Sequence, residues 1–407
     1  MRLVATAFAA YLLFLGAEAM AADFSFHPSL AVSEEYTDNV FESQDNKRAD
    51  YITRTVPGLA LQYKSALWKW DGSYAFDYRY YARRSRSDDT THDLAVKGLI
   101  KVIDEFFLLD LNEYYKRVSL DVTQDYTKDS LFFNQSDQNV FTASPYFVWR
   151  IDPKLNLKTG YRYANTWYRE PLAENKTDNG AFAEATYELS PNASLNGGYA
   201  FTHQNAETSD YDKHDVYGGA RYEFGNRSFV FGQVGNTWIR YSLGNRVDNL
   251  FWNAGITKNF ETVTANLVTG VKYSEDPLRN LTRERFYSAD LDYLFDRGHI
   301  AFSANYSEFD GTDGTTLDTT KYTVGIRGRY ELLTDFTGTL AFTAENFVRS
   351  YMSNSPRKFY VNAGLSYLLA PGLTSGLSYI FVDYYSPTVI ADNRQVNRVI
   401  LDLRKTF

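Results

Sequence analysis

The sequence has no cysteine among its 407 residues, so disulfides cannot hold the fold together. After the N-terminal leader it also lacks any run of 18 consecutive apolar residues, which excludes a membrane-spanning helix. The net charge is −8, and the lysines and arginines are scattered rather than clustered, which argues against nucleic acid as a partner. The fold must therefore be stabilised by backbone pairing.

Motifs for common chemistry are also missing. There is no phosphate-binding loop, no dinucleotide fingerprint and no Cys/His metal cluster. His203 and His214 flank an expected loop, but neither has a serine or carboxylate at a recognisable spacing. The segment 310–314 resembles a calcium loop loosely and lacks its closing glutamate. We predict no enzyme, cofactor or metal site, and keep an outer-membrane enzyme as an alternative.

Aromatic residues are abundant: they make up 17% of the chain, with 33 Tyr and 29 Phe, although the mean hydropathy is only −0.41. A soluble globule would need a large apolar core to bury so many rings. A membrane barrel does not, because its apolar side chains face lipid and its polar ones face water inside. The composition therefore favours a β-barrel embedded in a bacterial outer membrane.

Long segments alternate apolar and polar residues, which is the pattern of strands whose successive side chains point to opposite faces. In 68–80 the aromatic residues share one face and the charged residues share the other. In 229–241 both faces are apolar, so its orientation is left open. The clear alternation recurs in 93–102, 319–330 and 357–369. The predicted fold is a transmembrane antiparallel up-and-down β-barrel of 18–20 strands, with 20 as the best count.

Short turns and longer polar loops are expected to alternate along the chain, as they do between the periplasmic and outer sides of bacterial barrels. The short turns fall near 64–67, 104–105, 152–154, 190–193, 225–228, 261–262, 296–298, 332–335 and 370–372. The loops fall near 37–50, 83–90, 119–138, 168–177, 206–213, 242–247, 274–282, 310–318, 350–356 and 386–393. Aromatic residues near both ends of the strands predict two bands at the lipid–water interfaces. The loop-side band comprises Tyr163, Trp167, Tyr241, Tyr273, Tyr306 and Phe347.

The two ends of the chain carry targeting patterns. Arg2, the apolar segment 3–16 and the small residues near Ala21 predict a signal peptide over 1–21, with cleavage after Ala21 or Ala22. The barrel then occupies 22–407. The last strand alternates apolar residues up to a terminal aromatic and resembles the signal by which barrels are recognised for insertion: Val399, Leu401, Leu403 and Phe407. We therefore expect the barrel-assembly machinery, outer-membrane lipid and lipopolysaccharide as partners.

The polar faces of the strands are expected to line a lumen, because barrels of 16–18 strands already leave an aqueous channel. The candidate pore-lining residues carry both signs of charge, which fits a weakly selective path: Lys69, Asp71, Asp77, Arg79, Lys97, Lys101, Asp110, Lys158, Arg162, Glu184, Glu188, Asp290, Asp292, Arg327, Arg329 and Lys358. Pairing among these charges is the plainer interpretation of any one of them. The longest loop, 119–138, contains Leu131, Phe132 and Phe133, which either fold inward as a constriction or pack on neighbouring loops.

The opening segment, residues 28–41, followed by Asp50-Tyr51-Ile52-Thr53 and Val56-Pro57-Gly58-Leu59, resembles the outer-membrane β-barrel porin type 2 family. The match covers about residues 26–63. Members are often associated with exopolysaccharide or capsule export. The resemblance implies a pore, a polysaccharide and a periplasmic export protein as partners. We expect an export channel, with a general diffusion porin and a non-conducting, polysaccharide-anchoring barrel as alternatives.

Overall fold

The computed structural model describes residues 22–128, 130–208, 210–225, 227–312, 318–350 and 354–407. In the described chain the strands are β1 Asp23–Thr37, β2 Asp50–Lys64, β3 Trp68–Tyr81, β4 Asp89–Ile103, β5 Phe107–Ser119, β6 Gln135–Asp152, β7 Leu155–Tyr168, β8 Lys176–Ser190, β9 Ala193–Ala206, β10 Tyr211–Phe224, β11 Ser228–Tyr241, β12 Arg246–Asn259, β13 Val263–Asp276, β14 Arg279–Phe295, β15 Gly298–Gly311, β16 Thr319–Leu333, β17 Phe336–Arg349, β18 Arg357–Ala370, β19 Leu373–Tyr385 and β20 Arg394–Thr406. Short 3₁₀ helices lie in two of the loops, η3 Tyr126–Lys128 and η5 Ile390–Asp392.

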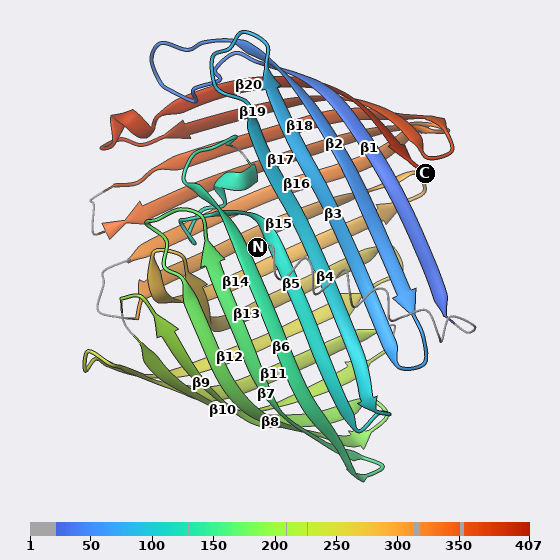
Figure 1. The fold of residues 1–407 in the computed structure, drawn as a ribbon, viewed down its shortest axis with the longest axis vertical. Coiled ribbons are helices and arrows are strands. Elements are labelled where there is room, and N and C mark those ends of the chain that lie inside the picture. The colour runs from blue at the N-terminus through green and yellow to red at the C-terminus, as the bar shows by residue number, and fades with distance from the viewer. Residues whose placement is uncertain (1–21, 129, 209, 226, 313–317, 351–353) are drawn as a thin grey trace, which may run out of the picture.

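All twenty strands form one antiparallel sheet in which each strand pairs with its neighbours in the sequence. The sheet closes because β1 pairs with β20 as well as with β2, as the ring of strands in Figure 1 shows. The amide of Phe407 donates to the carbonyl of Pro28 at 2.9 Å, so the last residue completes the closure. The predicted fold and the best strand count are both confirmed.

Turn length alternates around the barrel. Connections of two or three residues join the strands at one end, the turn end, and all but one of those at the other end, the loop end, are longer. The loop expected at 274–282 is the exception, and that prediction is wrong. Glu275 pairs with Leu281 and Ser274 with Thr282, so only Pro277 and Leu278 lie between the strands. The polar composition of this hairpin imitates a loop.

The apolar faces of the strands point out of the barrel and are exposed, as a lipid-facing surface requires. The predicted insertion signal lies on this face, with exposed fractions of 41% for Val399, 58% for Leu401, 47% for Leu403 and 66% for Phe407. Lys405 lies on the same face, and its ammonium donates to the carbonyl of Pro371 at 3.0 Å. The lysine thus reaches back to the polar turn, as long cationic side chains do near an interface.

Segment 229–241, which is left open by its sequence, is resolved as β11. Val234 and Trp238 are exposed on the outward face, at 53% and 41%. Ile239 and Tyr241 are buried in an apolar cluster with Tyr211. Both faces are apolar because this strand contacts a packed cluster inside the barrel as well as the expected lipid outside.

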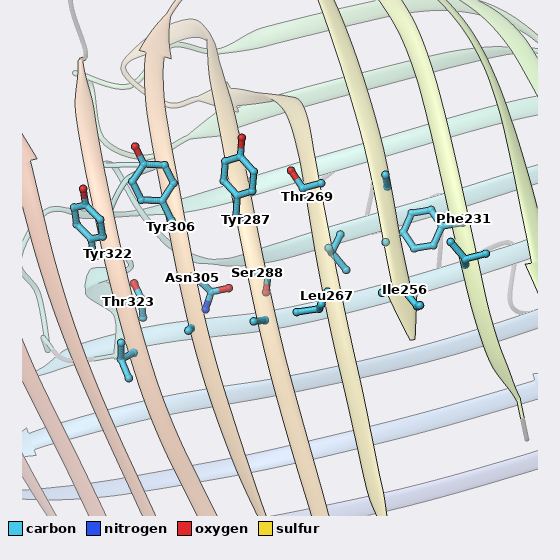
Figure 2. A pocket seen from close by; sticks show the side chains of 17 residues that line it. Phe231, Ile256, Leu267, Thr269, Tyr287, Ser288, Asn305, Tyr306, Tyr322 and Thr323 are labelled. Carbon is cyan, nitrogen blue, oxygen red and sulfur yellow. The ribbon is translucent and has the colours of Figure 1, made fainter. Parts of the chain in front are cut away.

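A row of tyrosines crosses the outward face at one level toward the loop end. Tyr287, Tyr306 and Tyr322 stand side by side on β14, β15 and β16, in register with Thr269 of β13 (Figure 2). On other strands, four tyrosine hydroxyls each contact a polar side chain diagonally across the hairpin: Tyr74–His92, Tyr161–Asn179, Tyr199–His214 and Tyr379–Asn397, at 2.5–2.8 Å. These residues form the outer tyrosine belt.

Three residues of the predicted loop-side aromatic band do not belong to it. Phe347 and Tyr241 are buried, at 0% and 3% exposure, and Tyr273 packs against the cluster that contains Tyr241. Alternation already places Phe347 and Tyr241 on the inward face, because Val348 and Trp238 are exposed on the outward one. Tyr273 lies in the part of β13 that no longer pairs with β12, which alternation cannot show. The prediction is therefore wrong for these three rings.

Two hairpins depart from the wall near the outer tyrosine belt. β12 pairs with β13 only up to Asn253–Gly270, so the described residues 246–252 and 271–276 pair only with β11 and β14. Likewise β4 pairs with β5 only up to Leu94–Tyr115. The β13–β14 and β5–β6 hairpins are thus separated from the strand before them at the loop end.

The described residues contain no helix that is long and apolar enough to cross a membrane. The predicted signal peptide, residues 1–21, lies outside the described residues and stays a prediction.

Candidate pore and its outer mouth

The predicted pore-lining residues are distributed over eight strands rather than gathered into one site. On β14, β16 and β18 the side chains of Asp290, Asp292, Arg327 and Lys358 line one internal cavity of about 800 Å³. Asp125, from the loop between β5 and β6, lines the same cavity, which places these side chains on the lumen side. That they line a conducting pore stays a prediction.

Many of the inward charges pair with one another, as the plainer interpretation of the sequence expects. Lys69 lies 3.4 Å from Asp71 along β3, and Lys358 contacts Glu345 at 2.8 Å. Arg327 approaches Asp292 at 3.9 Å. The inner face therefore presents a nearly balanced mixture of charges rather than a field of one sign.

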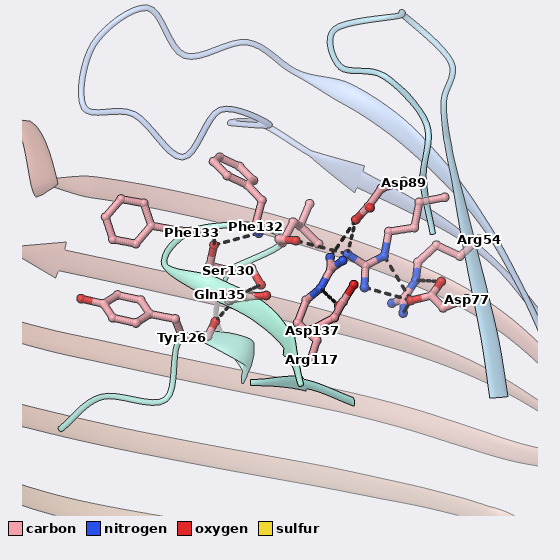
Figure 3. A network of polar contacts seen from close by, with 12 residues as sticks. Arg54, Asp77, Asp89, Arg117, Tyr126, Ser130, Phe132, Phe133, Gln135 and Asp137 are labelled. Carbon is pink, nitrogen blue, oxygen red and sulfur yellow. Dashed lines mark hydrogen bonds and ion pairs between the residues drawn. The ribbon is translucent and has the colours of Figure 1, made fainter. Parts of the chain in front are cut away.

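A long network of this kind is an arginine–aspartate row at the loop end, and Figure 3 shows the part of it from Arg54 to Asp137. Its members alternate in sign from β2 to the loop after β7: Arg54, Asp77, Arg79, Asp89, Arg117, Asp137 and Arg169. Neighbouring charges lie 2.7–3.8 Å apart. Apart from the exposed Arg169, the side chains of the row are partly or fully buried, so salt screens their charges less than it screens those of exposed surface pairs.

The 120–134 loop between β5 and β6 folds into the lumen. The guanidinium of Arg79 donates to the carbonyl of Leu131 at 3.3 Å, and the amide of Leu131 donates to the Glu42 carboxylate at 2.8 Å. The Leu131 side chain is 7% exposed and packs with Ile52 and Tyr81. Val40 belongs to the same cluster, and Val40 and Glu42 both lie in the loop between β1 and β2, so Leu131 packs on a neighbouring loop. That the segment forms a constriction stays a prediction.

The neighbouring Phe132 and Phe133 of the same loop are also anchored. Phe132 lies under the guanidinium of Arg86, whose Cζ is 3.6 Å from the ring centroid. Phe133 lies 4.9 Å from the Cζ of Arg394 on β20. Arg394 also contacts the rings of Tyr126 and Tyr384, so one cation joins the loop to the wall.

The far side of the same loop reaches strands on the opposite part of the sheet. Lys321 of β16 donates to the carbonyl of Thr123 at 3.1 Å, and Arg349 of β17 contacts Asp121 at 3.2 Å. Burial raises the pKa of the Tyr126 hydroxyl above its usual range, so this ring stays neutral inside the mouth. The 120–134 loop therefore contacts strands on opposite parts of the barrel wall. That it narrows a pore stays a prediction.

The loop end of the β13–β14 hairpin closes a second part of the mouth. The ammonium of Lys176 on β8 donates to the carbonyl of Asp276 at 2.6 Å, and the amide of Glu174 donates to the carbonyl of Pro277 at 2.7 Å. Leu281 is buried against Tyr211. These contacts tie the hairpin to strands four or five positions away in the sheet, so it lies across the opening.

Sequence reasoning missed the anchors of the mouth. Arg117, Lys321, Arg349 and Arg394 alternate like any inward residue, and nothing local distinguishes them. Lys321, Arg349 and Arg394 act through contacts with a loop about 200–270 positions earlier in the chain. Arg117 acts from a hairpin that leaves the barrel wall at the loop end. The apolar Leu131 in a polar segment is the one local signal that points to this region.

Among the described residues no group of three His, Cys, Asp or Glu side chains is placed to hold a metal ion. His203 and His214, the two histidines considered as catalytic candidates, have their contacts on the outward face of the barrel near the loop end. His203 contacts Asp212 at 2.7 Å and Asn205 at 3.2 Å, and His214 contacts the Tyr199 hydroxyl. The His214–Tyr199 contact is one of the hydrogen bonds of the outer tyrosine belt.

No family model matches the chain, and no curated protein is similar to it. Solved structures do share the fold. The FrpB iron transporter from Neisseria meningitidis, in its apoprotein form, aligns with a TM-score of 0.55 at 8% identity, covering 94% of this chain and 81% of its own. A mutant of the ferric enterobactin receptor PfeA from Pseudomonas aeruginosa gives 0.52 at 10% identity, covering 94% and 80%. A loop deletion mutant of OmpT, an outer membrane protein of Vibrio cholerae, aligns with a TM-score of only 0.40 at 12% identity, covering 95% and 100%, which is too low to indicate a shared fold.

A closed sheet with an apolar exterior and a polar interior satisfies every requirement of a membrane-spanning strand. The chain is an integral outer-membrane β-barrel. In this outer-membrane barrel the tyrosine belt corresponds to one interface, and the turn end, where the chain terminates, corresponds to the other. The likeness to transporter barrels concerns the fold alone, because the identities are 8% and 10%.

Proposed function

We propose that this outer-membrane barrel is a channel through which a secreted polysaccharide leaves the cell, in concert with a periplasmic export protein. The observation that carries the proposal is the closed twenty-stranded wall around a polar lumen of balanced charge. A wall of this size leaves an aqueous channel, and balanced charge suits a bulky polar chain better than a small ion. The resemblance of the opening segment to export-associated barrels agrees with this role.

Two measurements test the proposal. Purified barrel in planar bilayers is expected to conduct, and deletion of its gene is expected to reduce secreted polysaccharide while small-solute uptake is unchanged. Silent bilayers would contradict the channel. Conductance with unchanged secretion and reduced solute uptake would instead identify a general diffusion porin.

One observation favours a second candidate, the non-conducting barrel that anchors polysaccharide at the surface. The 120–134 loop and the β13–β14 hairpin both occupy the outer mouth. A fixed closure would abolish conductance but leave the surface intact as an anchor. Silent bilayers combined with loss of cell-bound, not secreted, polysaccharide on deletion would support this candidate.

A further inference from the structure

Four aromatic rings stand on the inner wall at alternate strands, halfway along each. They come from β8, β10, β12 and β14: Phe182, Tyr217, Phe251 and Phe286. Each lies directly opposite a glycine of the preceding strand, in the pairs Gly160–Phe182, Gly198–Tyr217, Gly235–Phe251 and Gly270–Phe286. We call these four rings the inner aromatic girdle.

Each ring of the girdle lies over its glycine. A Cβ added to any of the four glycines would come within 2.5–2.9 Å of the ring or the hydroxyl of its partner. A larger residue would lift the ring off the sheet, whereas glycine lets it lie along the wall with its other face toward the lumen. All four side chains are half-buried, so they remain accessible from the lumen.

The spacing of the rings is regular. Strands lie about 4.8 Å apart, so rings on every second strand are separated by roughly 9.6 Å, close to the length of a disaccharide. A flat ring offers an apolar face without hydrogen-bond demands, which suits the C–H face of a pyranose. Cations flank two of the rings: the Cζ of Arg162 lies 5.6 Å from the centroid of Phe182, and the Nζ of Lys272 lies 5.2 Å from that of Phe286.

We propose that the inner aromatic girdle is a glycan-binding track on which every second pyranose ring of the exported chain stacks. This inference rests on the proposed function, because a track serves a chain that passes through the lumen. The rings contact the C–H face of a pyranose and do not bond to its hydroxyl groups, so the track is expected to accept pyranose chains in general.

The competing role is structural, because aromatic rings over glycine also stabilise sheets. The barrel supplies a matched control for it. Trp70 lies over Gly98 in the same way, directly opposite it, but on the outward face. Loss of this ring removes the same packing without touching the lumen.

The test uses purified full-length barrel and maltohexaose as the probe, with polyethylene glycol of equal size as the control solute. In planar bilayers maltohexaose is expected to block the current in events longer than those of the glycol. The Tyr217→Leu/Phe251→Leu double variant is expected to shorten the sugar events roughly ten-fold. The Trp70→Leu variant is expected to leave them unchanged, and the aromatic swap Tyr217→Phe/Phe251→Tyr is expected to retain them.

Blocking events of equal duration for sugar and glycol would refute the glycan-binding track. So would a Trp70→Leu variant that shortens the sugar events as much as the double variant does. Either result would leave the conducting channel unaffected. Calorimetric titration of maltohexaose into the detergent-solubilised barrel separates the two proposals. Girdle-dependent binding without conductance would refute the channel alone. Folding of each variant is checked by its electrophoretic mobility before and after heating.

Discussion

Gly232 and Gly235 lie close together on β11, but they differ in the space available for an added methyl group. At Gly235 an added Cβ would lie 2.5 Å from the Cζ of Phe251 and closer still to the Val216 carbonyl, whereas at Gly232 it would meet nothing within 4 Å. Gly235→Ala is therefore expected to destabilise the barrel by roughly 1–3 kcal/mol. Guanidinium unfolding in lipid vesicles, followed by tryptophan fluorescence, measures the loss. Gly232→Ala is the matched control, and an equal loss there would refute the packing argument.

Arg79 does two things at once, since it pairs with Asp77 at 2.9 Å and holds the carbonyl of Leu131. Its side chain is only 13% exposed. Arg79→Ala is expected to cost roughly 1–3 kcal/mol, because it leaves partly buried acceptors without this donor. Lys69→Ala, which breaks an exposed pair on the same strand, is expected to cost under about 1 kcal/mol. The free energies of unfolding of the two variants are measured by urea titration. Equal losses in both would contradict the expected difference between the buried and the exposed pair.

For a single residue, the sequence predicts whether the side chain lies on the inward or the outward face of the barrel, but not what it contacts. Asp77 and Arg79 are two apart on one strand, so their shared face follows from alternation. Arg394 also alternates, yet two of its three aromatic contacts, with Tyr126 and Phe133, depend on a loop more than 250 positions earlier. Such contacts exist only once the barrel closes, and no local pattern encodes them.

The 120–134 loop is the element that we expect to set the width of the mouth. Arg349 and Arg394 hold its two ends through Asp121 and Phe133. The Arg349→Ala/Arg394→Ala double variant is expected to free the loop and raise single-channel conductance. Arg327→Ala, which removes an inner cation that pairs with Asp292, is the control for lost charge. A conductance that changes equally in both would mean that charge, and not the loop, sets the current.

Element boundaries follow from the sequence wherever strands end at turns, because Asp152-Pro153, Ser190-Pro191 and Pro371-Gly372 carry turn chemistry. They fail at the β13–β14 hairpin. There the strands extend past the membrane into a mouth where both faces contact protein or water. The rule of apolar alternation ceases to apply, so the paired residues 274–282 look like a loop.

The whole molecule depends on one face meeting lipid and the other meeting water, and β13 offers neighbouring residues to test this. Leu267 is 55% exposed on the outward face, whereas Asn266 lines the internal cavity. Leu267→Arg is expected to destabilise the barrel by roughly 2–4 kcal/mol, since charge is costly in the bilayer interior. Asn266→Arg is expected to be tolerated. Reversed costs in vesicle unfolding titrations would invert the assignment of the faces.

The orientation of the barrel is open to direct measurement because the chain has no native cysteine. Leu243 lies in a loop and is 78% exposed, and Leu67 lies in a turn and is 46% exposed. An impermeant thiol reagent applied to whole cells is expected to label Leu243→Cys and not Leu67→Cys. Labelling of the turn position alone would mean that the chain is inserted the other way up.

The parting of β12 from β13 fixes how deep the barrel can sit. Beyond Asn253 and Gly270 the facing edges of these strands have no ladder between them, and unpaired backbone amides are not tolerated among acyl chains. The hydrocarbon layer must therefore end at or below this level. Thr269 lies one residue closer to the turn end and is in register with the tyrosine row. The end of the β12–β13 pairing and the tyrosine row thus place the edge of the hydrocarbon layer at the same level. Everything above it, including the hairpin that lies across the mouth, stands in the aqueous or sugar-rich zone outside the acyl chains.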